Sequence, residues 1–332
     1  MKLSSWKVPR SPSPGYNAGM SADPPAVHPP PLDAHIRELI GLAVTEDIGH
    51  GSGAAGDPTT ELSIDPHWTA AGALVARQPG VLAGTFLIPE ILAHYSKELI
   101  WKPIRPDGEA VAAGTRLGVI SGPVQRMLSA ERVVLNFVSH LSGVATLTRA
   151  YVDCARSHAP VVGKPVICDT RKTMPGFRVL EKYAVRCGGG VNHRMALFDG
   201  VMLKDNHIAA LTRRFTSPMA LTEIVRHVRN SLPQKMPMWL EIDSLDQLPA
   251  AIAGGPDIIL LDNMSAKEVK RAVHERDRLA PDGRPLLEAS GGIQLENLPD
   301  YARTGVDRIS IGAITHSAPI LDVGFDMEPD RP

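Results

Sequence analysis

The second half of the chain contains six short apolar segments, and a helical pattern follows most of them. Strands that alternate with helices form parallel sheets, and continuous apolar runs indicate strands that are covered on both faces. Because no dinucleotide-binding glycine fingerprint accompanies this repeat, the pattern favours an α/β barrel over an open sheet. Six strands are fewer than the eight of the common barrel. The six segments are 165–168, 200–203, 238–240, 257–261, 285–287 and 308–311.

The first half has a different organisation. Residues 1–31 hold eight of the 29 prolines, among Ser, Gly and Ala, so we expect a disordered tail. Helical periodicity starts at Leu32, with Asp33 as its expected N-cap. Short apolar runs between 70 and 119 predict strands and turns around a helix near 86–97. A long helix is expected to begin near Ser129, with Gly143 as a weak point in its middle.

Charge and hydropathy exclude several classes of protein. Thirty-five basic and 36 acidic residues leave a net charge of −1, whereas a nucleic-acid binder or a polybasic membrane protein needs an excess of positive charge. No run of apolar residues is long enough to span a bilayer. The three cysteines form no CxxC pair, which indicates a reduced, cytoplasmic protein.

Polar and glycine residues follow each predicted strand. In parallel barrels the loops at the carboxyl ends of the strands converge on one cavity, where the chemistry takes place. A single Asp or Lys after a strand is more often a turn residue or a cap, but six such ends in succession favour a site. These ends carry Asp169, Thr170, Arg171 and Lys172; Lys204, Asp205, Asn206 and His207; Glu241 and Asp243; Asp262 and Asn263; Glu288, Ser290, Gly291 and Gly292; and Gly312 and Ala313.

Positive charge is concentrated between residues 169 and 207. Seven Lys and Arg residues outnumber four Asp and Glu residues in this stretch. We interpret Lys182 and Arg186, at helical spacing, as a solvated face that Glu181 supports. A lone histidine is more often structural than catalytic; for His193, after three glycines, both interpretations stay open. The better candidates for binding an anionic ligand are Arg171, Lys172, His193, Arg194 and Lys204.

Two further features favour a phosphorylated substrate with a metal ion. The glycines that close the last two predicted strands expose backbone N–H groups, as in the phosphate sites of barrel enzymes, although tight turns would explain them as well. Glu241 and Asp262 lie on neighbouring predicted strands and offer the oxygen ligands that suit Mg²⁺. No His/Cys cluster has the spacing of a zinc site.

Several longer stretches resemble the quinolinate phosphoribosyltransferase family. They are 131–137 (ERVVLNF) with 141–146 (LSGVAT), the unbroken run 169–207, 260–263 (LLDN), 288–293 (EASGGI) and 312–319 (GAITHSAP). The resemblance covers about residues 32–328 and leaves out the proline-rich tail and a glycine-rich insertion near 49–56.

The resemblance implies an N-terminal α/β sandwich domain and an incomplete parallel α/β barrel of about six strands. The sandwich is expected over 32–142, with 318–332 returning to it, and the catalytic barrel over 143–317. The resemblance also implies a homodimer that transfers phosphoribose from phosphoribosyl pyrophosphate to quinolinate. That reaction releases pyrophosphate and CO₂, gives nicotinate mononucleotide and belongs to de novo NAD biosynthesis.

Roles for individual residues follow from the same resemblance. Lys172, Glu241 and Asp262 would be catalytic and contact phosphoribosyl pyrophosphate, and the two carboxylates would hold Mg²⁺, directly or through water. The 5-phosphate would lie against Ser290, Gly291, Gly292, Gly312 and Ala313. Quinolinate would be bound by Arg132, reaching over from the other subunit, together with Arg171, His193, Arg194 and Lys204.

Three alternatives remain open at this point. A paralogue with the same fold would use another aromatic acid with phosphoribosyl pyrophosphate. A barrel lyase would form a Schiff base through Lys204 or Lys172. A non-catalytic protein would bind anions without turnover.

Overall fold

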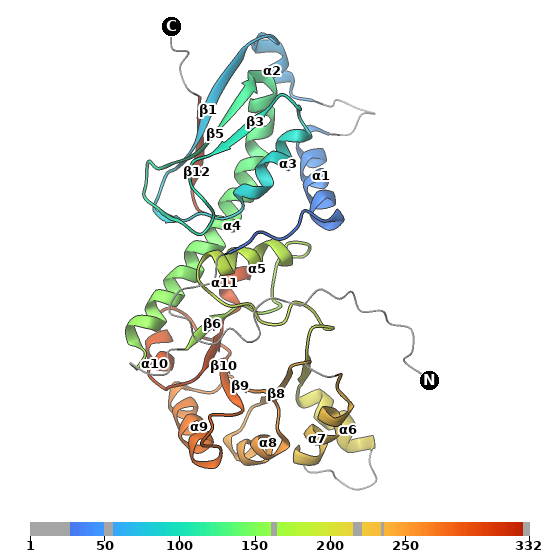
Figure 1. Cartoon of the computed structure of the whole chain (residues 1–332), viewed down its shortest axis with the longest axis vertical. Coiled ribbons are helices and arrows are strands. Elements are labelled where there is room, and N and C mark those ends of the chain that lie inside the picture. The colour runs from blue at the N-terminus through green and yellow to red at the C-terminus, as the bar shows by residue number, and fades with distance from the viewer. Residues whose placement is uncertain (1–26, 50–55, 161–164, 215–220, 234–235, 328–332) are drawn as a thin grey trace.

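The computed structural model describes residues 27–49, 56–160, 165–214, 221–233 and 236–327 (Figure 1). Two sheets dominate it, one antiparallel and one parallel, and a long helix connects the units that contain them. Residues 1–26 of the expected tail lie outside the described ranges, as do residues 50–55 of the glycine-rich insertion. The last residues of that expected tail contact the parallel unit, since Arg186 donates to the carbonyl of His28 at 3.2 Å.

The antiparallel unit comes mainly from the first third of the chain. Its four-stranded sheet has the order β12-β1-β5-β3, in which the last strand of the chain pairs with the first. The strands are β1 (Thr69–Ala76), β3 (Ile100–Pro103), β5 (Arg116–Pro123) and β12 (Val323–Met327), and β2 (Gly80–Val81) pairs with β4 (Ala110–Val111). The helices are α1 (Ala34–Ile48), α2 (Pro58–Ser63) and α3 (Ile88–Ala93), with a 3₁₀ turn η1 at Thr85–Leu87.

Local sequence explains where the first helix begins. Asp33 caps α1 as expected, because its side chain accepts the backbone N–H of Ile36 at 3.0 Å. The helix expected near 86–97 is shorter, consisting of η1 followed by α3.

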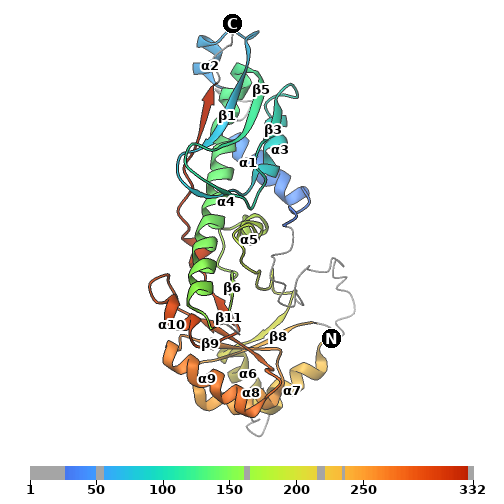
Figure 2. The same ribbon diagram turned by 60° about the vertical axis from the view of Figure 1, so that its left-hand side comes forward.

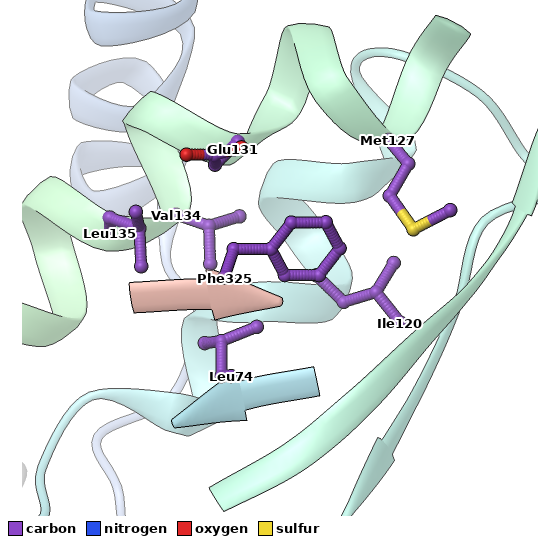
Figure 3. A pocket seen from close by; sticks show the side chains of 7 residues that line it. All are labelled: Leu74, Ile120, Met127, Glu131, Val134, Leu135 and Phe325. Atoms are coloured by element: carbon purple, nitrogen blue, oxygen red, sulfur yellow. The ribbon is translucent and has the colours of Figure 1, made fainter. Parts of the chain in front are cut away.

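A pocket lies between the antiparallel sheet and the helix that follows β5. It is lined by apolar side chains, Phe325 among them, and by Glu131 (Figure 3). It leaves no room for a water molecule, so it is packed core rather than a binding site.

Helix α4 (Val124–His158) has 35 residues and runs along both units, as Figure 2 shows. It begins five residues before the expected start at Ser129, directly after Pro123 of β5. Gly143 lies in the middle of this continuous helix, and its weakness there stays a prediction. Packing requires the glycine, because a Cβ there would overlap the carbonyl of Pro319 and lie 2.9 Å from Cα of Ile320.

The parallel unit contains all six strands expected from the apolar segments. They are β6 (Val166–Cys168), β7 (Val201–Leu203), β8 (Met238–Ile242), β9 (Ile258–Asp262), β10 (Leu286–Ser290) and β11 (Arg308–Ser310). The strand order is β6-β11-β10-β9-β8-β7. Strands β7 to β11 lie side by side in chain order, and β6 pairs with β11, so β6 and β7 form the two edges. A sheet that curves in this order without a β6–β7 ladder is an incomplete barrel, which confirms the expected fold class.

Helices cover the outer face of this sheet, as the ribbon in Figure 1 shows. They are α5 (Arg178–Cys187), α6 (Asp205–Arg214), α7 (Leu221–Ser231), α8 (Leu248–Gly254), α9 (Ala266–Leu279), α10 (Leu298–Ala302) and α11 (Ala313–His316), with a 3₁₀ turn η2 at Leu245–Gln247. Within the described residues, no helix combines the length and the apolar character that a bilayer-spanning segment requires.

Candidate active site

The registers of the parallel sheet place the expected site residues side by side. Ser290 at the end of β10 pairs with Asp262 of β9 on one side and with Ser310 of β11 on the other. Ser310 pairs in turn with Cys168 of β6, and Cys168 also forms a parallel bridge to Val191. The loops that follow these residues therefore emerge at one edge, which is where active sites of parallel barrels lie.

Arg171 and Arg194, with Lys204 nearby, form a cationic centre at this edge. Arg194 is buried, and both its burial and the neighbouring positive charge of Arg171 lower the pKa of its guanidinium. The Nε of Arg171 is buried without a hydrogen-bond partner. An unpaired buried donor beside a second guanidinium is costly in the free protein and is relieved by a bound anion, so this pair fits a carboxylate or phosphate ligand.

Lys204 and Glu241 form an ion pair between the end of β7 and β8. Glu241 also contributes to the electrostatic environment of Arg194, and it is one of the charges that raise the pKa of that guanidinium. The predicted grouping of Lys204, Arg194, Arg171 and Glu241 is thus present in a single chain. Glu241 lies within β8 rather than after it, because that strand continues two residues beyond its expected end at 240.

Lys172 lies on the opposite side of the same edge. Its Cδ is 3.1 Å from the position that a Cβ on Gly312 would occupy, and His316 Nε2 is 3.0 Å from that position. Its backbone carbonyl accepts a hydrogen bond from Thr315 at 2.7 Å. Any side chain on Gly312 would therefore displace Lys172 or His316, so the glycine allows the lysine to lie at the end of β11.

The glycines after β10 adopt conformations that favour glycine. Gly291 and Gly292 have φ values of 98° and 62°, and a side chain on Gly291 would overlap the amide of Asn263. Asn263 itself has a φ of 53°, and its Nδ2 donates to Asp262 at 2.8 Å. Strained backbone of this kind needs support from its surroundings and is frequent at ligand sites. Here it fixes the orientation of Asp262 next to exposed glycine backbone.

The interpretation of Glu181 and Lys182 as part of a solvated face is wrong. Both side chains are fully buried. Lys182 forms an ion pair with Asp169 and donates to the carbonyl of His193 at 3.0 Å. Glu181 accepts the N–H of Met174 at 3.2 Å and lies 3.0 Å from Nε2 of His140. The positions of Glu181 and Lys182 on α5 gave no indication of these partners, because Asp169 follows β6 and His140 lies on α4.

Arg186 is half-buried rather than solvated, with its guanidinium 5.7 Å from the ring centroid of Tyr183.

Arg178 has a structural role that the sequence did not indicate. Its guanidinium donates to the carbonyls of Arg171 at 3.3 Å and Met195 at 3.4 Å. It therefore joins the loop that carries Arg171 to the loop that follows Arg194. Charge alone singled out Arg178 within the cationic stretch, and nothing local distinguished it from a ligand-binding arginine.

Arg132 is the one expected quinolinate ligand that is not at this edge. It is exposed on α4, and no interaction among the described residues links it to the strand-end side chains. A cavity of about 170 Å³ lies close to it, between α1 and α4, lined by Ala43, Glu46, Asp47, Val133, Asn136 and Phe137. That cavity is remote in the sequence from the strand ends and contains none of the expected site residues.

Comparison with known proteins decides the family. Residues 57–142 match the model of the quinolinate phosphoribosyl transferase N-terminal domain, and residues 144–326 match that of the C-terminal domain. This chain belongs to the quinolinate phosphoribosyltransferase family. The resemblance expected from the sequence is thereby confirmed. The boundary between the two matches falls inside α4, so one continuous helix belongs to both.

Individual relatives of this phosphoribosyltransferase cover nearly all of the described chain. It is 41% identical to nicotinate-nucleotide pyrophosphorylase [carboxylating] of Mycobacterium leprae, over 88% of this chain and 96% of that protein. It is 38% identical to the probable enzyme of the same name from Bacillus subtilis, over 88% and 93%. The solved nicotinate-nucleotide pyrophosphorylase of Francisella tularensis matches with a TM-score of 0.77 at 33% identity, over 89% of this chain and 96% of that one.

Proposed function

We propose that the protein transfers phosphoribose from phosphoribosyl pyrophosphate to quinolinate and decarboxylates the product to nicotinate mononucleotide. The observation that carries this proposal is the Arg171–Arg194 pair beside Lys204, with the buried Nε of Arg171 unpaired. Quinolinate has two adjacent carboxylates, so it needs several fixed cations. Family membership and the names of the relatives support the same reaction.

The other end of the edge suits the second substrate. The exposed backbone at Gly292 and the side chain of Lys172 beside Gly312 would bind a phosphate group, and Glu241 and Asp262 would contact the ribose between the two ends. Lys172 stabilises the negative charge that develops on the leaving pyrophosphate. The carboxylates of Glu241 and Asp262 stabilise the positive charge that develops on the ribose.

We propose that Mg²⁺ is the cofactor and that Glu241 and Asp262 would hold it. Both offer hard oxygen ligands from neighbouring strands, since Glu241 of β8 pairs with Leu260, two residues before Asp262 of β9. Two carboxylates suit a Mg²⁺ ion that completes its coordination with water and substrate phosphates. The ion, when bound, neutralises the charge of the pyrophosphate.

We further propose a homodimer in a reduced, cytoplasmic compartment. Arg132 is exposed and separate from the cations of its own chain, so it is available to a second subunit. All three cysteines are free thiols. Mixing inactive Arg132→Ala and Lys204→Ala proteins under subunit exchange should restore part of the activity, because a heterodimer contains one intact site. No recovery despite proven exchange would refute the shared site.

The reaction itself is tested with purified protein, Mg²⁺ and phosphoribosyl pyrophosphate, with quinolinate or nicotinate as the acceptor. We expect ¹⁴CO₂ release from carboxyl-labelled quinolinate, together with nicotinate mononucleotide, and no product from nicotinate. Turnover of nicotinate alone would refute the proposal. Arg171→Lys keeps the charge but loses the planar fork, so we expect a large rise in the KM for quinolinate and little change in that for phosphoribosyl pyrophosphate.

A further inference from the structure

His193 lies in the interior of the barrel, where protein groups already engage its polar atoms. Its backbone N–H donates to Asp169 at 2.8 Å, and its carbonyl accepts from Lys182. The imidazole stacks on the indole of Trp239, with ring centroids 4.6 Å apart and an interplanar angle of 22°. The residue is 7% exposed, so its ring has little contact with solvent.

The two ring nitrogens have different partners. Nδ1 accepts the backbone N–H of Arg194 at 2.7 Å, so Nδ1 carries no proton. Nε2 lies 3.4 Å from Oε1 of Glu288, which can only accept when ionised. The ring is therefore the Nε2–H tautomer, with its single proton directed at Glu288 and its lone pair at Arg194.

Glu288 is fully buried on β10 and remains ionised. Burial by itself raises the pKa of this carboxyl, but the charge of Arg308 and hydrogen bonds, including one from Ser310, hold the pKa well below its ordinary value. Arg308 donates to its second oxygen at 2.8 Å. The carboxylate is thus a fixed acceptor, and only one residue, Ala289, separates it from Ser290 at the end of the strand.

We infer that His193 is a positioning residue for Arg194, held in one tautomer by Glu288, and that its ring nitrogens do not contact quinolinate. Through this chain Glu288 links the glycine-rich end of β10, where phosphate is expected, to the backbone of Arg194, whose guanidinium is itself held by the carbonyl of Gly200 at 2.9 Å. The inference deepens the proposed function and rests on it only where substrate is involved. The tautomer itself is a property of the free protein.

The first test is ¹⁵N NMR of the full-length protein labelled at histidine nitrogens. We expect His193, assigned by comparison with His193→Phe, to show a protonated Nε2 and an unprotonated Nδ1 in the free protein. Saturation with quinolinate, verified by calorimetry, should leave both nitrogen resonances in the same state. A protonated Nδ1, or a change of tautomer when quinolinate binds, would overturn the inference. Failure of quinolinate to bind at all would contradict the proposed function and leave the free-protein result intact.

The second test compares two conservative variants. His193→Asn keeps an acceptor at the position of Nδ1, which takes the Arg194 N–H, whereas His193→Gln keeps a donor at the position of Nε2. If the ring acts through Arg194, His193→Asn retains more kcat/KM for quinolinate than His193→Gln does. The opposite order would show that Nε2 contacts the substrate.

Glu288→Gln tests the other end of the chain. We expect the KM for quinolinate to rise about tenfold, as for loss of other supporting hydrogen bonds. The control Glu223→Gln, at an exposed position on α7, should leave both KM values within twofold. Unchanged quinolinate kinetics in folded Glu288→Gln would overturn the role of Glu288, and the NMR experiment stands even if this variant does not fold.

Discussion

Replacing Lys182 by Met tests whether the buried ion pair beneath the site is structural. The variant removes one charge and leaves Asp169 fully buried, which in comparable cases costs about 3–5 kcal/mol of the free energy of unfolding. Asp169 would keep two of its three donors, the Asn192 amide at 2.6 Å and the N–H of His193. The loss should therefore lie near the lower limit, about 3 kcal/mol, which corresponds to a fall in Tm of roughly 6–12 °C.

The assay is urea unfolding at pH 7, with Tm measured in parallel by calorimetry. The matched control is Lys270→Met, an exposed lysine on α9, which should change stability by less than about 0.5 kcal/mol. Adding Asp169→Asn to Lys182→Met removes the unpaired charge and should recover roughly 1–2 kcal/mol. A loss below about 1 kcal/mol, the range of exposed pairs, would refute the reasoning, as would a double variant no more stable than Lys182→Met.

Three further predictions concern other parts of the chain. Gly143→Ala should destabilise the protein by about 1–3 kcal/mol because its methyl group would meet the backbone near residue 319, whereas Gly41→Ala, in open space on α1, should stabilise it by about 0.5–1 kcal/mol; calorimetry compares the two. Glu288 has a lowered pKa when folded, so its contribution to stability is complete at neutral pH, begins to be lost as the pH falls below the ordinary carboxyl value of 4.5, and is lost fully only below the much lower folded pKa. In urea titrations the wild type should therefore lose part of its advantage over Glu288→Gln between pH 6 and pH 3 and should keep the rest at pH 3. Burial raises the pKa of Cys168 and of Cys187 to about 12. At pH 8 a disulfide reagent should therefore modify Cys154 first and the two buried thiols only on unfolding, and rapid labelling of all three would contradict their burial.

The sequence predicted the parallel sheet because its signal is local. Each strand is a short apolar run, and each run ends in residues that buried strands do not tolerate unless they serve a site. The order of the strands then follows from the handedness of parallel connections, so strand-end residues such as Arg171 and Lys204 could be grouped before any coordinates were known. The fold class was predictable for the same reason, whereas the family was predictable because long stretches such as 169–207 resemble it.

The supporting charges were not predictable in this way. Lys182 and Glu181 occupy adjacent positions on a short helix, and helical spacing of charges normally indicates a solvated face. Their burial depends on Asp169 and His140, which come from a strand and from a helix that the spacing does not reveal. The packing role of Gly143 was not predictable for a similar reason, since the need for glycine comes from a chain segment about 176 residues away.

The continuity of α4 has a consequence for changes in chain length. At 1.5 Å per residue, its 35 residues extend about 50 Å and carry both Arg132 and the residues that pack on the parallel unit. Inserting one residue between them would turn one end relative to the other by about 100° and lengthen the helix by 1.5 Å. In the proposed dimer, an exposed arginine that reaches a second subunit would then face a different direction while every local contact of its own turn stayed intact. The number of residues in this helix would therefore matter to the proposed shared site as much as the side chains do.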